Sequence, residues 1–139
     1  MQVDYVSLIR KVYSMPELKA CPIETTFKII GKKWTSLILR ELFRGASQFS
    51  QLQKRVKGIN SKILSHRLKE LQRASILKKS VVSVEPVRIE YTLTEKGKQL
   101  MPILAAAMRF SMANLAESVF TDGKPRTFDA LSGQFTKRD

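Results

Sequence analysis

The chain has 139 residues, 43% of them hydrophobic, and a formal net charge of +13. This length and apolar content fit one globular domain with a buried core. No apolar run reaches the ~18 residues that a membrane-spanning helix needs. The first residues lack the pattern of a secretory signal, and the single cysteine excludes an internal disulfide. We therefore expect a cytoplasmic protein that does not associate with membranes.

The positive charge is concentrated in one part of the chain. Residues 28–98 contain 17 Lys and Arg against 5 Asp and Glu, whereas the two flanks together hold 8 basic and 7 acidic residues. Such segregation favours a polyanionic partner, because lysine and arginine neutralise phosphates and release counterions. We expect this partner to be double-stranded DNA. An acidic membrane surface fits less well, because the basic segment 60–73 lacks the Trp or Phe of interfacial helices.

The N-terminal third predicts three short helices. Residues 5–13 are amphipathic, and we expect the segment 1–20 to form an arm that contacts a second copy of the chain. Pro16 and Pro22 separate this helix from the next, at 23–30. A further helix is predicted at 34–43, followed by Gly45 as its C-terminal cap. The residues expected on the inner sides of these two later helices are Ile23, Phe27, Ile30, Trp34, Leu37, Ile38 and Leu42.

Residues 50–73 predict a helix-turn-helix. Ser50 and Gln53 match a capping box that begins a short helix ending at Val56, and Lys57, Gly58 and Ile59 form the turn. The helix 60–73, capped by Asn60 or Ser61, follows. At helical spacing its leucines fall on one arc and its cations on the opposite arc. A solvated surface helix is the alternative for this segment taken alone. The two arcs consist of Leu64, Leu68 and Leu71, and of Lys62, His66, Lys69 and Arg73.

Two strands are predicted directly after the basic helix, at 77–84 and 88–94, joined by Glu85, Pro86 and Val87. The resulting fold class is mainly α with a small β-hairpin, a winged helix-turn-helix at 21–98.

Residues 95–120 predict one long helix, capped by Thr94 and bent or loosened by Pro102. From Leu100 onward it is apolar nearly all round, which requires burial. We expect residues 99–120 to pair two copies of the chain, although docking on the monomer core is an alternative. The residues expected at this dimer contact are Leu100, Ile103, Leu104, Met108, Phe110, Met112 and Leu115.

The tail 121–139 is richer in polar residues and glycine. Phe128, Leu131 and Phe135 have helical spacing, so the sequence leaves open a short docked helix or a frayed tail.

The winged fold places candidate DNA contacts on particular residues. A helix fits the major groove, and side chains on its outer face read base edges. The candidates for base contacts are Lys62, Ser65, His66 and Lys69, and Ser61, Arg67 and Arg73 are further candidate DNA contacts of this helix. Arg73 lies too far along the helix to read bases. Arg67 lies at the edge of the apolar arc, so the sequence leaves open a phosphate contact or an internal pair with an acidic neighbour. For His66 the alternative is a plain surface position. The preceding helix and the wing can contact phosphates, and for Arg88 on the wing a minor-groove contact is also open. The candidates are Gln48, Ser50, Gln51, Lys54, Arg55 and Arg88.

Cys21 precedes Pro22 at the expected start of a helix, where the helix dipole favours a thiolate. It is a candidate thiol sensor, and a small buried residue is the alternative. One histidine and one distant cysteine make a poor metal site, so we expect neither metal nor cofactor. The sequence shows no phosphate loop, no paired carboxylates and no nucleophile motif, which argues against an enzyme.

Several separated motifs resemble HxlR-type transcriptional regulators, a prokaryotic family related to MarR regulators. They lie, in order, at 21–24 (CPIE), 29–35 (IIGKKWT), 37–42 (LILREL), 49–52 (FSQL), 59–62 (INSK), 64–71 (LSHRLKEL) and 88–94 (RIEYTLT), followed by Gly97. The resemblance covers about residues 21–104 and implies a homodimer that binds a palindromic operator. It also implies a small-molecule or electrophile effector, because some members sense thiol modification at the motif that contains Cys21.

Two functions remain in competition at the level of sequence. The first is a sequence-specific transcriptional regulator. The second is a nonspecific, nucleoid-associated or RNA-binding winged-helix protein that uses the same positive charge.

Overall fold

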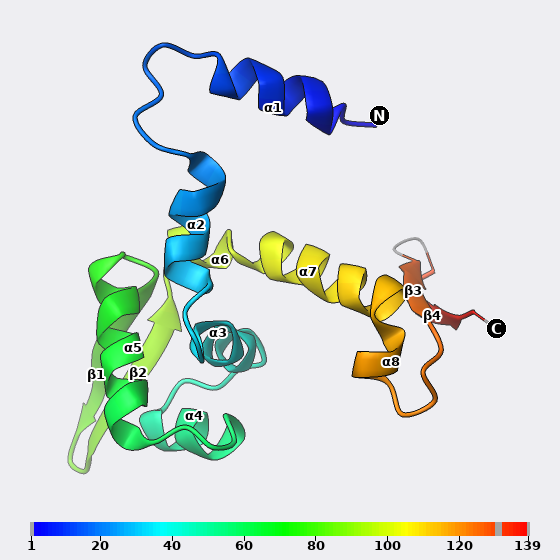
Figure 1. Ribbon diagram of the computed structural model, residues 1–139. Helices are drawn as coiled ribbons and strands as arrows, with labels where there is room; N and C mark the ends of the chain where they lie inside the picture. Colours follow the sequence, from blue (N-terminus) through cyan, green and yellow to red (C-terminus); the bar gives the residue numbers. More distant parts are fainter. Residues whose placement is uncertain (1, 130–131, 139) are drawn as a thin grey trace. The chain divides into compact units, whose positions relative to one another are not determined.

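The computed structural model describes residues 2–129 and 132–138, which divide into two compact units, 1–74 and 75–139 (Figure 1). Among the described residues, no helix is long and apolar enough to cross a membrane.

The first unit is helical throughout, as the sequence predicts. Several helix boundaries differ from the prediction by one residue; for example, the second helix begins at Pro22 and the fourth ends at Arg55. The third helix begins at Thr35, because Trp34 adopts a left-handed backbone conformation with φ of 80°. The fourth begins at Phe49 and not at Ser50. Its elements are α1 (Tyr5–Tyr13), α2 (Pro22–Ile30), α3 (Thr35–Phe43), α4 (Phe49–Arg55) and α5 (Ser61–Arg73).

The capping box predicted at Ser50 and Gln53 is wrong by two residues. The side-chain oxygen of Gln51 accepts from the backbone N–H groups of Ser47 and Gln48 at 3.0 and 3.1 Å. Gln48 therefore caps α4, and Ser50 lies within the first turn of the helix. The error arises because the sequence holds two pairs at capping-box spacing, Gln48 with Gln51 and Ser50 with Gln53, and the helix uses the first.

The core of the first unit forms where α3, α4 and α5 turn their aliphatic faces inward. On α3 the sequence predicts that Leu37 and Trp34 point inward, but the Leu37 side chain is 36% exposed and Trp34 is only half-buried. Leu39 is buried in the core instead. On α2 only Ile30 is buried, and Ile23 and Phe27 are exposed. Each fully buried aliphatic side chain contributes about 1.5–3 kcal/mol. The most deeply buried are Ile38, Leu39, Leu52, Val56, Leu64, Leu68 and Leu71.

A buried carboxylate, Glu41, lies among these apolar residues. Arg40 Nε donates to it at 2.7 Å and Arg44 Nη1 at 3.0 Å. Burial alone raises the pKa of Glu41, but the hydrogen bonds from the two guanidinium groups outweigh it and lower the pKa below its ordinary value. The group is therefore held as a charged pair, because an uncompensated buried carboxylate would be strongly destabilising.

In the second unit, β1 (Leu77–Val84) and β2 (Val87–Leu93) form the predicted antiparallel hairpin. Val81 pairs with Ile89 and Val84 with Val87, and the register shifts between Val81 and Ser83. Such a bulge increases the local twist of the hairpin.

Thr94 caps α6 (Glu95–Lys98) by accepting from the Gly97 N–H at 3.0 Å. A Cβ on Gly97 would lie 2.2 Å from the Ile76 carbonyl oxygen, so only glycine allows α6 to approach the chain before β1 this closely.

The single helix predicted at 95–120 is wrong, because the chain breaks into α6, α7 (Met101–Asn114) and α8 (Ala116–Val119). Pro102 has no N–H to donate and lies in the first turn of α7, so the break precedes it. Among the predicted dimer residues, Leu100 and Met112 are buried within the chain and Leu104 is half-buried. The others are exposed, namely Ile103, Met108, Phe110 and Leu115.

The tail forms a second hairpin, so the helix and the frayed tail considered for 121–139 are both wrong. Strands β3 (Arg126–Asp129) and β4 (Gln134–Lys137) pair antiparallel and place the Phe128 and Phe135 rings 5.0 Å apart. Leu131, the third residue of the expected helix, lies outside the described residues. The contact between Phe128 and Phe135 thus forms across two paired strands and not along one helix face.

Candidate nucleic-acid interface

The helices α4 and α5 form the helix-turn-helix that the sequence predicts. Leu52 and Val56 of the first helical segment, Ile59 of the turn and Leu64 of α5 are all buried, so the two helices share one core. The connection bends at Gly58, where φ is +88° and a side chain would be strained. Asn60 then caps α5, its Oδ1 accepting from the Ile63 N–H at 2.8 Å. The entry of α5 is thus fixed by local interactions.

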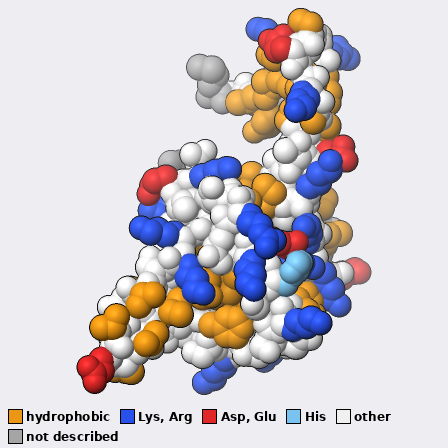
Figure 2. All heavy atoms as spheres, turned by 90° about the vertical axis from the view of Figure 1, so that its left-hand side faces the viewer, with side chains coloured by type: hydrophobic (Ala, Val, Ile, Leu, Met, Phe, Trp, Pro, Cys, Tyr) orange, Lys and Arg blue, Asp and Glu red, His pale blue; other side chains and the backbone are white. Residues whose placement is uncertain are grey.

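The outward face of α5 carries the predicted cations. Lys62, Lys69 and Arg73 are exposed, and the His66 side chain is 61% exposed. Ser61 is exposed at the first turn, and Ser65 is half-buried. Figure 2 shows a surface on which Lys and Arg side chains gather, with few acidic side chains among them. This face can neutralise phosphates and donate hydrogen bonds to base edges.

Arg67 differs from its neighbours, because its side chain turns inward and is only 20% exposed. Its Nε donates to the Lys33 carbonyl at 3.0 Å, and its Nη1 donates to Glu70 Oε2 at 3.1 Å. The structure therefore favours the internal pairing that the sequence left open for Arg67. The Arg67 side chain therefore helps to hold α5 in place and does not project from its outward face.

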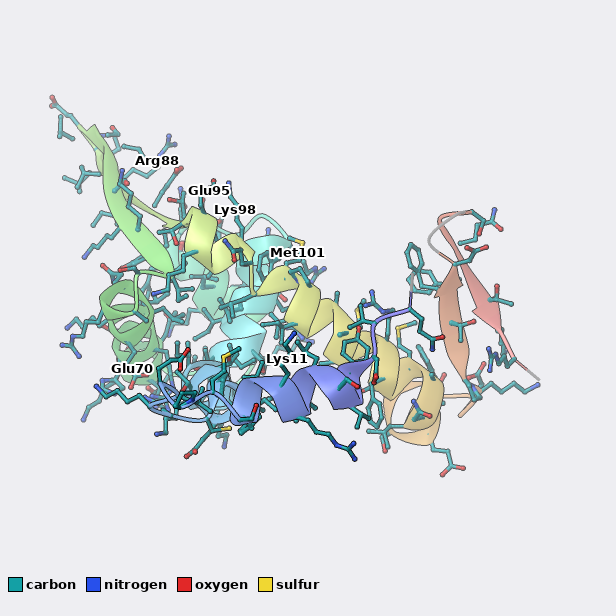
Figure 3. All side chains as sticks on the ribbon, turned by 90° about the horizontal axis from the view of Figure 1, so that it is seen from above. Lys11, Glu70, Arg88, Glu95, Lys98 and Met101 are labelled. Carbon is teal, nitrogen blue, oxygen red and sulfur yellow. The ribbon has the colours of Figure 1, made fainter. Side chains whose placement is uncertain are left out.

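Glu70 joins α5 to the segment between α2 and α3. Lys32 Nζ donates to Glu70 Oε1 at 2.7 Å, and His66 Nε2 lies 3.3 Å from the same oxygen. The hydrogen bond from Lys32 is the main cause that lowers the pKa of Glu70 below its ordinary 4.5, and Arg67 contributes further. Glu70, labelled in Figure 3, is thus a structural anchor of the helix.

We expect Glu70→Gln to lower the free energy of unfolding by about 1 kcal/mol at pH 7, since the ion pair is partly solvated. Because the pKa of Glu70 is lowered in the folded state, its ionised form stabilises the protein above the ordinary value of 4.5. This stabilisation is lost as the pH falls from 4.5 through the lower, folded-state pKa. The difference between wild type and variant should therefore shrink from pH 6 to about pH 3. Urea unfolding at several pH values measures it, and a difference that grows on acidification would contradict the anchor.

The candidate phosphate contacts of α4 are divided between structure and surface. Gln51 is engaged in capping, and Gln48 is half-buried at the N-terminal end. Ser50 is exposed in the first turn, while Lys54 and Arg55 are exposed in the last turn. The two cations also complement the negative end of the helix dipole.

Arg88 is exposed on the hairpin, opposite Ser83, and projects from β2 in Figure 3. The surface of the hairpin is also apolar, which the sequence did not indicate. Four valines are exposed there, namely Val81, Val82, Val84 and Val87. The exposed Lys78 and Lys79 lie near its base.

Cys21 is partly exposed at the start of α2, where the sequence places it. The structure adds that it caps the helix, because its Sγ accepts from the Glu24 N–H at 3.4 Å. Its second partner, Tyr13, was missed by the sequence analysis. The Tyr13 hydroxyl lies 2.8 Å from Cys21 Sγ. This hydrogen bond is the main cause that lowers the pKa of Cys21 below its ordinary value, and it raises the pKa of Tyr13.

Within the part of the chain that the structure describes, His, Cys, Asp and Glu form no group of three or more that could hold a metal ion. The carboxylate of α5, Glu70, is paired with Lys32 and Arg67.

Comparison with known proteins decides the family. The profile of the family described as HxlR-like helix-turn-helix matches residues 29–119. The chain belongs to the HxlR-like helix-turn-helix family. It is 38% identical over 98 residues to the uncharacterized regulator YvaP of Bacillus subtilis, which covers 70% of this chain and 91% of YvaP. It is also 38% identical over 84 residues to the B. subtilis regulator YodB, covering 60% of this chain and 75% of YodB.

Solved structures of two regulators have the same fold as this HxlR-like protein. Reduced YodB from B. subtilis matches with a TM-score of 0.61 and 34% identity, covering 66% of this chain and 91% of YodB. The redox regulator HypR in its reduced form matches with a TM-score of 0.65 and 28% identity, covering 70% and 99%. This chain is therefore a transcriptional regulator with a winged helix-turn-helix, and not an enzyme.

Proposed function

We propose that this protein represses or activates transcription in the cytoplasm as a homodimer that binds a palindromic operator in double-stranded DNA. The observation that carries the proposal is the outward face of α5, where Lys62, His66 and Lys69 are exposed while Arg67 and Glu70 hold the helix from behind. A rigidly held helix with exposed donors is what sequence reading in a major groove requires.

The contacts divide by position along α5 and its neighbours. Ser61, Lys62, Ser65 and His66 lie in the N-terminal half of α5, from which helix-turn-helix proteins contact bases, and Lys69 follows about one turn after Ser65. The remaining candidates bind phosphates, where they add affinity without reading sequence. These are the half-buried Gln48 and the exposed Ser50, Lys54, Arg55, Arg73 and Arg88.

Unpaired apolar surface supports the homodimer. No residue of α1 is buried, and Tyr5 is 68% exposed. On α7, Phe110 is 60% exposed, and Ile103 and Met108 are exposed with it. Large apolar side chains left exposed on a helix favour an interaction site there. A second copy of the chain, contributing the same residues, would bury it symmetrically.

Selection of bound duplexes from a random pool tests the operator proposal. We expect an inverted repeat whose half-sites are centred about 10 bp, or ~34 Å, apart, because two symmetric helices then enter successive turns of one DNA face. Enrichment of single, non-repeated sites would contradict the symmetric dimer. Recovery of a pool without any shared motif would favour a nonspecific nucleoid-associated or RNA-binding protein.

The environment of Cys21 supports a thiol response. Its sulfur is hydrogen-bonded to a phenol and accepts from a helix N-terminal amide, and both groups can donate to a thiolate and stabilise it. Thiolates are the reactive form toward oxidants and electrophiles. The fold neighbours include YodB in diamide-treated and quinone-bound forms.

We expect Tyr13→Phe to raise the pKa of Cys21 and to slow its alkylation by iodoacetamide at pH 7, because the variant loses the hydroxyl that donates to the thiolate. A pH series of alkylation rates measures the shift. Tyr5→Phe, which removes an exposed hydroxyl from the same helix, is the matched control. If the alkylation rates of Tyr13→Phe follow the same pH profile as wild type, Tyr13 does not lower the pKa of Cys21.

The thiol response itself is tested by treating the protein with diamide and measuring its operator affinity. We expect the wild-type affinity to change and the affinity of Cys21→Ser to remain constant. If diamide has no effect on wild type, or an equal effect on both proteins, Cys21 is not the sensor.

A further inference from the structure

A cavity of about 350 Å³ lies within the first unit, between the end of α2, the start of α3 and the end of α5. Ile29, Leu71 and Ala74 give it apolar walls, and the buried Thr35 closes one side. This volume lies at the lower end of the range of small-molecule sites, which combine apolar walls with a few polar groups. The chemistry of its polar groups therefore decides what it can hold.

Those polar groups are mainly cationic. Lys28, Lys32 and Arg73 line the cavity, and Glu70 is the one carboxylate among its lining residues. Glu70 is already engaged by Lys32 at 2.7 Å and by Arg67 at 3.1 Å. The negative charge of Glu70 is thus largely offset within the protein. Lys28 and Arg73 therefore make the electrostatic potential in the cavity positive.

Lys28 and Arg73 are available to a ligand. Lys28 Nζ lies 3.7 Å from Glu24 Oε1, and both side chains are about two-thirds exposed or more. So exposed a pair contributes little and is easily exchanged for another anion. Arg73 is exposed in the last turn of α5, and its guanidinium can bind a carboxylate through two hydrogen bonds.

We propose that this cavity binds a small organic carboxylate with an apolar body. Arg73 and Lys28 hold the carboxylate, and the apolar part lies against Ile29 and Leu71. A purely inorganic anion would leave the apolar walls unused, and a neutral compound would leave the cations unused. Binding joins the end of α2 to the end of α5, the helix that the proposed function places on DNA. A regulatory effect of the ligand on operator binding rests on that proposed function, whereas the site itself does not.

The test uses the full-length protein without DNA and sodium benzoate as the probe. We expect a saturable titration of backbone amide signals around residues 28–35 and 70–74, with a dissociation constant on the order of 1 mM. Benzamide, which has the same ring and no charge, and inorganic phosphate, which has charge and no ring, should each bind at least about tenfold more weakly.

Arg73→Gln and Lys28→Gln should weaken benzoate binding about tenfold or more, because each removes a charge-assisted hydrogen bond. Lys96→Gln, an exposed lysine of α6, is the control and should leave binding unchanged. Amide spectra of the variants check that each is folded. No saturable shift by about 20 mM benzoate, equal binding of phosphate or benzamide, or equal binding by Arg73→Gln would overturn the site.

A separate titration with the selected operator tests regulation. Benzoate that fills the cavity should change the operator affinity of wild type and leave that of Lys28→Gln nearly constant. An operator affinity unchanged at saturating benzoate would overturn the regulatory role. Because the DNA-free titration does not depend on the operator, failure of the proposed function and failure of the site are distinguishable.

Discussion

Lys62→Ala, His66→Ala and Lys69→Ala should each lower the affinity for the operator by about 10- to 100-fold, and lower the affinity for random DNA by much less. A side chain that hydrogen-bonds a base edge contributes about 1–3 kcal/mol of discrimination, whereas a phosphate contact contributes to all sequences alike. All three side chains are exposed on α5. Fluorescence anisotropy with both duplexes at one fixed salt concentration measures the two affinities.

Lys54→Ala and Arg55→Ala are the matched controls, because these exposed cations lie on α4. They should weaken both duplexes similarly and reduce the slope of affinity against salt by about one per lost phosphate contact. Equal losses on operator and random DNA from the α5 variants would show that the helix does not read sequence.

Phe110→Asp should convert the protein from a dimer to a monomer at micromolar concentration and reduce operator affinity by about 100-fold or more. The ring is 60% exposed on α7, so a charge there costs the isolated chain little but would be buried in a dimer contact. Loss of the dimer removes the gain in effective concentration that couples two half-sites. Sedimentation velocity measures the first effect and anisotropy the second.

The control for this variant is Lys96→Asp, which places the same acidic group on the exposed, polar surface of α6. It should remain dimeric. Circular dichroism shows whether each variant is folded. A wild-type monomer at micromolar concentration would refute the homodimer, and a dimeric Phe110→Asp would place the contact elsewhere than α7.

The elements that the sequence predicts correctly are those encoded by local signals. The helix α5 has leucines at helical spacing and Asn60 at its cap, and both features act within a few residues. The strands β1 and β2 show the β-branched residues and turn that hairpins need. Because these signals do not depend on distant contacts, the sequence alone predicts the helix-turn-helix and the hairpin.

The parts that the sequence misses depend on contacts between distant residues. Arg67 donates to the carbonyl of Lys33, and Glu70 binds Lys32, so the inner side of α5 is fixed by residues more than thirty positions away. No periodicity joins Tyr13 to Cys21 across the intervening proline segment. A hydrogen bond of this kind follows only from the packed chain.

The C-terminal errors have the same origin. Apolar composition alone extended the helix through Leu115, but the chain breaks there into α7 and α8. The tail hairpin is stabilised by Asp122, which pairs with Lys137 and with Arg126 at 3.0 Å. Short strands of this kind carry weak local preference, so tertiary contacts decide between helix and hairpin.

The central claim is that the exposed face of α5 makes this protein a sequence-specific reader of DNA. The most direct measurement is the ratio of wild-type dissociation constants for the selected operator and for a random duplex of equal length at 150 mM salt. We predict tighter operator binding by about 10³-fold or more, as specific regulators show. A ratio within about tenfold would contradict the claim and identify a protein that binds nucleic acid through its charge alone.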